Sequence, residues 1–135
     1  MEQHISTKHT DRGEIALKVL ITPNDLNHHG TVFGGAILAY FDLAASGYAM
    51  EHVGHKVVLV SVKDSAFLAP VFANEYITFY AKTAKRGKTS ITIDLEAWRS
   101  KPSAGSREAD KIATATITMV AVGDDLRPRQ IKELN

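Results

Sequence analysis

Apolar residues recur every three or four positions in one part of the chain, whereas elsewhere they alternate with polar residues or form runs rich in β-branched residues. The first pattern runs from residue 31 to residue 50 and predicts a helix that ends near Gly54. Its expected buried face consists of Ile37, Leu38, Phe41, Ala45 and Ala49. Several other positions in the segment are Ala, Gly or Ser, which favours a central helix that other backbone encloses closely.

The second pattern predicts five strands. They are expected at residues 14–22, 56–70, 75–83, 89–98 and 112–122. In the fourth strand one face carries Ile91, Ile93, Leu95 and Ala97, and the other carries Thr92, Asp94, Glu96 and Trp98. Residues 84–88 predict a hairpin turn around Gly87. The apolar residues that follow the second strand are expected to pack in the core: Phe67, Leu68, Val71 and Phe72.

The order of these elements is strand, helix and then four strands, without the further helices that parallel crossovers require. The fold class is therefore expected to be α+β, with one antiparallel sheet around one helix. Residues 14–123 form the expected domain, between a flexible arm (1–13) and a charged C-terminal tail (124–135), with a polar loop at 99–111. Sheet edges and a partly covered helix favour a second copy of the chain, so we expect at least a homodimer.

Composition narrows the choice of function. The chain has 135 residues and a formal net charge of +1, which argues against bulk nucleic-acid binding. It has no cysteine, so disulfides, thiolate metal sites and a cysteine nucleophile are excluded. The polar start of the sequence and the lack of a long apolar run predict a cytoplasmic protein that does not insert in membranes.

One carboxylate stands out in the apolar helix. Asp42 would be costly to bury unless it is paired, hydrogen-bonded or faces a wet cleft. Gly34 and Gly35 lie where the helix begins, and their amides could approach a ligand closely at the positive end of the helix. Asn27, in the preceding loop, could position water or a carbonyl, or could simply close an Asx turn. Together these groups suit attack of water on an acyl carbonyl.

The same residues carry a family resemblance. The chain contains P-x-D-x-N-x-x-G-x-x-F-G-G-x-x-L-x-x-x-D from Pro23 to Asp42, followed by VSVKDSAFLAPV and AKRGKTSITIDLEAW. These segments, in this order, closely resemble the YciA-type acyl-CoA thioesterases of the hotdog fold. The resemblance covers about residues 14–122.

The resemblance implies a five-stranded antiparallel sheet wrapped around one long central helix, and active sites at the interface of a dimer. It also implies a trimer of dimers, which makes a hexamer. In such enzymes the residue matching Asp42 is the general base on water or, alternatively, the nucleophile. The residue matching Asn27 comes from the partner subunit, and backbone at Gly34 or Gly35 polarises the thioester carbonyl. The reaction would release a free acid and coenzyme A and would need no cofactor.

The predicted hairpin carries four positive charges within seven residues: Lys82, Lys85, Arg86 and Lys88. They could form a solvated turn that protects an edge, or they could bind the phosphates of coenzyme A. The resemblance supports the second role for Arg86, Gly87, Lys88, Thr89 and Ser90. A P-loop is excluded, because position 82 is Lys where that motif needs Gly and a strand follows where it needs a helix.

Histidines supply the remaining candidates. His28, His29, His52 and His55 could ligate a metal, but no further ligands fall in register, so we expect no metal site. His29 is kept as a candidate for the substrate cleft. Two other functions stay open: a hydratase or dehydratase on the same fold, which would rely on a histidine, and an acyl-CoA sensor that binds without catalysis. The pairing of Asp42 with Asn27 favours the thioesterase.

Overall fold

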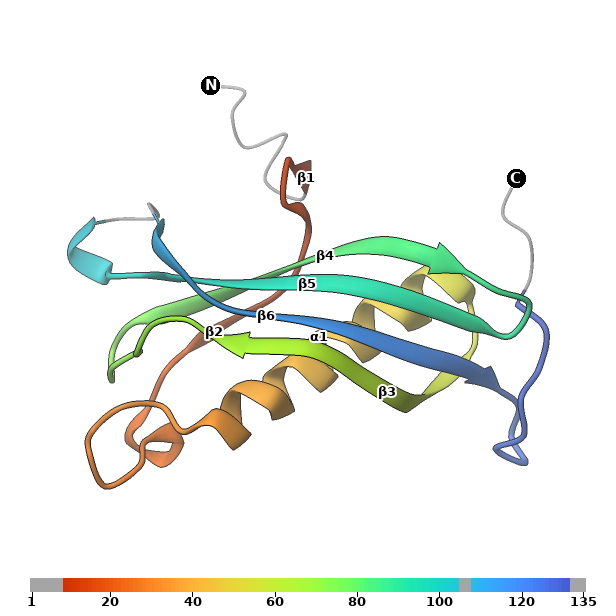
Figure 1. Ribbon diagram of the computed structural model, residues 1–135, viewed down its shortest axis with the longest axis horizontal. Coiled ribbons are helices and arrows are strands. Elements are labelled where there is room, and N and C mark those ends of the chain that lie inside the picture. Colours follow the sequence, from red (N-terminus) through yellow and green to blue (C-terminus); the bar gives the residue numbers. More distant parts are fainter. Residues whose placement is uncertain (1–8, 105–107, 132–135) are drawn as a thin grey trace.

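One long helix lies across one face of a single antiparallel sheet (Figure 1). The computed structural model describes residues 9–104 and 108–131. The strands are β1 (His9–Thr10), β2 (Gly13–Leu20), β3 (Lys56–Phe67), β4 (Tyr76–Arg86), β5 (Ser90–Ser100) and β6 (Glu108–Val122). The helix is α1 (Gly34–Val53), and two short 3₁₀ turns occur at η2 (Pro23–Asp25) and η3 (Pro102–Ala104). This architecture confirms the predicted hotdog fold and its five main strands.

The sheet order is β1-β2-β4-β5-β6-β3, and every neighbouring pair is antiparallel. β3 follows the helix in sequence but pairs only with β6, the last strand, so within the described residues its other edge is unpaired. An unpaired edge of twelve residues is long enough to template pairing with another chain. The architecture therefore leaves one sheet edge available beside the helix.

The helix has well-defined ends. Phe33 precedes it in an extended conformation, and Gly54 ends it with φ of 74°, a left-handed conformation that glycine adopts without a Cβ clash. Residues 31–33, which the periodicity placed in the helix, belong instead to the preceding loop. The reason is a short bridge between Leu26 and Val32, which keeps the chain extended until Phe33.

Alternation correctly predicted the buried faces of the central strands. Ile91, Ile93, Leu95 and Ala97 of β5 are each at most 1% exposed, and the corresponding face of β6 is buried as well. Phe41 of α1 packs edge-on against Phe79 of β4, with ring centroids 5.2 Å apart. The core therefore lies between α1 and the middle of the sheet.

Several residues expected in the core are exposed. Leu38 of α1 is 38% exposed, and Phe67, Leu68 and Phe72 are between 45% and 55% exposed, whereas Val71 is buried as expected. These exposed side chains lie on α1, at the end of β3 and in the loop after it, where the described chain provides no second layer. The core prediction was wrong for these four residues because periodicity cannot tell which apolar face a single chain covers.

The loops and chain ends also differ from expectation. The loop expected at 99–111 is shorter, since β5 reaches Ser100 and β6 begins at Glu108. β1 lies within the expected flexible arm (1–13), whose residues 1–8 are outside the described part. In the tail (124–135), Arg129 N–H donates to Ala121 O at 2.9 Å, and Ile131 is only 7% exposed. No helix of the described chain is long and apolar enough to cross a membrane.

Candidate active site

Asp42 lies in the middle of α1 and is half-buried. Its Oδ1 accepts a hydrogen bond from the hydroxyl of Ser46, one turn later, at 3.3 Å. The side chain borders a cavity of about 430 Å³ between α1 and β3. The other residues that line this cavity are Leu38, Ala39, Leu59, Val62, Ser65 and Ile117. The carboxylate thus faces a mostly apolar hollow beside the unpaired sheet edge.

Gly34 and Gly35 are the first two residues of α1, so their amides have no acceptor within the helix. The first turn contains no acidic residue, and Phe33 provides no side-chain cap. The helix therefore supplies no acidic or capping side chain of its own to its positive end. A Cβ at position 35 would lie 3.2 Å from the Phe33 ring, whereas one at position 34 would make ordinary contact with Phe67 at 3.5 Å. The Phe33 and Phe67 rings thus lie close to the first two residues of the helix.

A second cavity, of about 450 Å³, lies beside Gly34. It is lined by Val32, Gly34, Ile37, Phe67, Leu68, Ala69 and Pro70. Gly34 and Asp42 are eight residues apart in one straight helix, which separates their levels along the axis by about 12 Å. A single carbonyl therefore cannot contact the Asp42 carboxylate and the Gly34 amide of the same chain.

Asn27 lies in the loop that leads into the helix. Its Oδ1 accepts hydrogen bonds from the backbone N–H of His29 at 2.8 Å and of Thr31 at 3.2 Å, and its Nδ2 donates to the Thr31 hydroxyl at 3.2 Å. The Asx turn considered from the sequence is thus present. An amide has two N–H donors, so one proton of Nδ2 is not used by the Thr31 contact. Asn27 belongs to the loop at the N-terminal end of α1 (Figure 1), whereas Asp42 lies in the middle of the helix.

The histidines of this loop are exposed. The rings of His28 and His29 lie 3.9 Å apart between centroids, beside Asn27 in sequence. His29 therefore sits at the same end of the molecule as the Gly34 cavity.

The basic hairpin lies at the other end of the helix (Figure 1). Arg86 and Lys88 are exposed, and an Arg86 guanidinium nitrogen lies 3.4 Å from the His52 carbonyl near the helix C-terminus. Gly87 N–H donates to Ser90 O at 2.8 Å and closes the turn, while Thr89 O accepts from Ala121 of β6. The structure therefore brings Arg86 to Ser90 together as one ordered turn. Because His52 lies ten residues after Asp42, the turn contacts α1 about 15 Å along the helix axis from Asp42.

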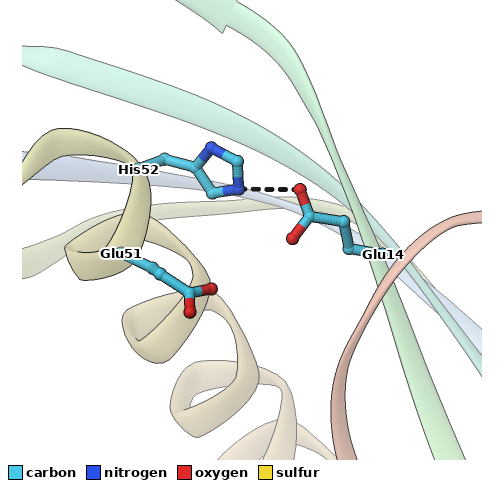
Figure 2. Close-up of side chains that lie close together, drawn as sticks. All are labelled: Glu14, Glu51 and His52. Carbon is cyan, nitrogen blue, oxygen red and sulfur yellow. Dashed lines mark ion pairs between the residues drawn. The ribbon is translucent and has the colours of Figure 1, made fainter. Parts of the chain in front are cut away.

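Figure 2 shows a cluster that sequence reasoning missed. Glu14 of β2 meets Glu51 and His52 of α1, with one ligand-type atom from each within 4.8 Å of one another, beside a cavity of about 570 Å³. His52 Nε2 lies 2.9 Å from a Glu14 oxygen, while Glu51 is exposed. The imidazole nitrogen that would ligate a metal already has a carboxylate partner. The simplest role of the contact is to hold the last turn of α1 against β2.

Two other polar contacts, of Ser46 with Asp42 and of Tyr40 with Asp25, were not predicted from the sequence. Ser46 could have been noticed, because a hydroxyl four residues after an acid shares its helix face. The hydrogen bond from the Tyr40 hydroxyl to Asp25 Oδ1, at 2.7 Å, joins residues too far apart in sequence for such a rule.

Comparison with known proteins agrees with this geometry. The family model of the thioesterase superfamily matches residues 29–106. The acyl-CoA thioester hydrolase YciA of Salmonella typhimurium is 36% identical over 90% of this chain and 92% of its own length. A hexameric thioesterase from Yersinia pestis has a TM-score of 0.82 at 34% identity, covering 89% of this chain and 96% of that one.

A more distant solved relative is the acyl-CoA hydrolase of Staphylococcus aureus. Its aspartate-to-alanine variant has a TM-score of 0.76 at 27% identity, covering 85% of this chain and 69% of that one. An asparagine-to-alanine variant of the same enzyme has been solved in complex with coenzyme A. The family match covers more than half of the chain and the Salmonella relative aligns along most of it, so this chain belongs to the thioesterase superfamily.

Proposed function

We propose that this chain hydrolyses acyl-CoA thioesters to a free acid and coenzyme A. The observation that carries the proposal is the placement of two chemical groups on one uncovered face. A half-buried carboxylate borders one apolar cavity, and Gly34, the first residue of a helix whose first turn has no acidic residue, borders the other. A thioester needs both a base for the attacking water and a donor for the oxygen that becomes negative.

The two groups act together only if they come from different copies of the chain. Leu38 lies four residues after Gly34 and four before Asp42. A two-fold axis near Leu38, with the two helices antiparallel, would place Asp42 of one copy level with Gly34 of the other. Helices in contact lie about 8–10 Å apart, which leaves room for a thioester between them. The exposed Leu38, Leu59 and Val62 supply an apolar surface for this contact.

The proposed reaction is attack of water on the thioester carbonyl. Asp42 takes a proton from water while the water oxygen attacks the thioester carbonyl. The amide of Gly34 or Gly35 of the other copy binds the oxyanion, and Asn27 of that copy orients water or the carbonyl with its remaining N–H. Collapse breaks the carbon–sulfur bond, and the proton passes to the leaving coenzyme A thiolate. General base catalysis contributes about 3–5 kcal/mol and one oxyanion donor about 3–4 kcal/mol.

Relatives provide independent support for this pairing. In the Staphylococcus aureus enzyme the asparagine and the aspartate replaced by alanine are 15 positions apart. Asn27 and Asp42 have the same separation here. The Yersinia pestis relative is hexameric, which is consistent with a trimer of dimers for this chain.

The basic hairpin is proposed to bind the phosphates of coenzyme A. Arg86 and Lys88 provide exposed cations on an ordered turn, and the turn residues Gly87, Thr89 and Ser90 provide the backbone and hydroxyl groups around them. The hairpin lies along the helix from Asp42, as an extended coenzyme with its thioester at the base requires. His29 of the other copy, two residues after its Asn27, would line the substrate cleft.

The deciding experiment measures thiol release from acyl-CoA esters of several chain lengths. We expect turnover by the wild-type protein and a loss of at least about 100-fold in kcat for Asp42→Ala, because general base catalysis is worth that much. Asp94→Ala is the matched control, since that aspartate is exposed on the far side of β5, where it accepts a hydrogen bond from Thr116. It should keep its activity.

Three outcomes would reject the proposal. Tight binding of acyl-CoA without thiol release would indicate a sensor. Hydration or dehydration of enoyl or hydroxyacyl esters, without hydrolysis, would indicate a hydratase. Near-normal hydrolysis by a folded Asp42→Ala protein would remove Asp42 from the mechanism.

A further inference from the structure

The loop that holds Asn27 is closed by its own backbone. Asn27 N–H donates to Thr31 O at 2.8 Å, Gly30 N–H donates to Asn27 O at 3.1 Å, and Phe33 N–H donates to Asp25 O at 3.2 Å. We call residues 25–33 the Asn27 loop. With these bonds the loop keeps its own shape, so its place relative to the rest of the molecule depends on what holds it from outside.

Besides its junction with α1 at Phe33 and the bond from Val32 N–H to Val71 O at 2.9 Å, the Asn27 loop is held by the side chain of Asp25. Its Oδ1 accepts a hydrogen bond from the Tyr40 hydroxyl at 2.7 Å, and its Oδ2 accepts one from the Thr22 backbone N–H at 3.0 Å. Both oxygens of the carboxylate are therefore engaged. The Thr22 bond is local, whereas the Tyr40 bond spans 15 positions and connects the loop to α1.

Tyr40 is well suited to be the fixed partner. It lies two turns inside α1, and its ring packs near Phe79 of β4, a fully buried residue, with centroids 6.1 Å apart. Burial of the hydroxyl and the adjacent Asp25 carboxylate raise the pKa of Tyr40 to about 12, so the phenol remains a donor at neutral pH. Tyr40 and Asp42 are two residues apart on the helix, which turns their side chains about 200° from each other. Tyr40 therefore does not face the cavity of its own Asp42.

We propose that Tyr40 is a positioning residue that acts across the subunit interface: it fixes the Asn27 loop through Asp25 and thereby places Asn27 in the active site of the neighbouring copy. This inference rests on the proposed function, in which Asn27 serves the other copy's Asp42. It assigns to each helix two separate tasks. Asp42 serves the site on its own chain, and Tyr40 serves the site of the partner.

The first test uses Tyr40→Phe with Tyr48→Phe as matched control. Tyr48 lies on the same helix, and its hydroxyl also makes one hydrogen bond, 2.8 Å to the Thr83 hydroxyl. Tyr40→Phe should lower kcat about tenfold and leave KM for the coenzyme A ester within twofold, because the basic hairpin is untouched. Tyr48→Phe should change kcat less than twofold. In an Asn27→Ala background, Tyr40→Phe should cause no further loss, since the residue it positions is gone.

The second test assigns Tyr40 to one of the two sites. Oligomers co-expressed from Asp42→Ala and Asn27→Ala chains, each with its own tag, contain one intact type of site: Asp42 of the Asn27→Ala chain with Asn27 of the Asp42→Ala chain. Tyr40→Phe added to the Asp42→Ala chain should lower the recovered activity about tenfold. The same substitution on the Asn27→Ala chain should leave it unchanged.

The outcomes separate the two proposals. Recovered activity that responds equally to Tyr40→Phe on either chain, or only on the chain that supplies Asp42, overturns the role of Tyr40 alone. An additive loss in the Asn27→Ala background does the same. If the mixed oligomers recover no activity, the two-copy site itself is wrong, and the role of Tyr40 is rejected with it.

Discussion

At the scale of single residues, the candidate site depends on two aspartates that have different hydrogen-bond partners. Asp42 accepts one hydrogen bond from Ser46, whereas Asp25 uses both of its oxygens to hold Tyr40 and Thr22. Asp42 lies on α1 and Asp25 contacts the same helix from the preceding loop, yet their surroundings suit different roles. A carboxylate that faces a cavity can take a proton from water, while one with both oxygens occupied can only position what it binds.

The titration of Tyr40 tests this arrangement at the residue scale. Its pKa of about 12 lies above the ordinary value of 10, so the folded state binds the proton more tightly than the unfolded state does. Its contribution to stability is therefore complete below pH 10 and is lost as the pH rises toward 12. In ultraviolet difference titrations of the folded protein, a tyrosine that ionises at about pH 12 in the wild type should be missing in Tyr40→Phe. Loss of a tyrosine that ionises near pH 10 would contradict the assignment.

At the scale of elements, the helix and the hairpin divide the chemistry between them. The N-terminal turn of α1 presents amides, its middle presents the carboxylate, and its C-terminal turn lies beside Arg86 of the hairpin between β4 and β5. The antiparallel register of β4 with β5 runs to Arg86 paired with Ile91, so the strands hold the turn up to its last residues. One rigid helix thus sets the distance between the base and the cationic turn.

Substitutions in the basic hairpin should change the affinity for the substrate more than the rate of the chemical step. Replacing both Arg86 and Lys88 by alanine should raise KM for a coenzyme A ester about tenfold or more and change kcat little, because phosphate contacts are made equally in the bound substrate and the transition state. Steady-state kinetics at low salt provide the measurement. Lys63→Ala, an exposed cation on β3, is the control and should leave KM unchanged. An unchanged KM for the double variant would mean that the hairpin only protects the sheet edge and does not bind the coenzyme.

The elements were largely predictable from sequence, while their polar connections were not. Alternation in residues 89–98 and 112–122 gave two strands and their buried faces, because one side of each faces the helix. Gly54 and Gly87 marked the helix end and the hairpin turn. In contrast, the bonds of Tyr40 with Asp25 and of His52 with Glu14 depend on how distant segments meet, and no local pattern encodes them. Leu38 and Phe67 were predicted to lie in the core, but they are exposed in a single chain.

At the scale of the whole molecule, an apolar face beside β3 is uncovered. Leu38, Leu59, Val62 and Phe67 are all at least 38% exposed beside the unpaired edge of β3. Contiguous exposed apolar side chains of this kind typically mark an interface. The same face carries both cavities of the candidate site, so assembly and activity are expected to depend on the same surface.

Leu38→Glu tests this dependence. A charge near the proposed two-fold axis would face its own symmetry mate, and the pair of buried carboxylates should prevent association. We expect a lower molar mass by light scattering at micromolar concentration and loss of thioesterase activity. Leu126→Glu is the control, because Leu126 is 64% exposed and lines neither the Asp42 cavity nor the Gly34 cavity. A Leu38→Glu protein that keeps both its mass and its activity would place the interface elsewhere.

The docked C-terminal segment has a practical consequence for anyone who handles this protein. Ile131 N–H donates to Lys88 O at 2.7 Å, so residue 131 is fastened to the cationic hairpin. A polyhistidine or acidic handle joined close after residue 131 would lie within reach of the surface proposed to receive the coenzyme and would compete with its phosphates. Handles placed far from this segment are the safer choice for kinetic work.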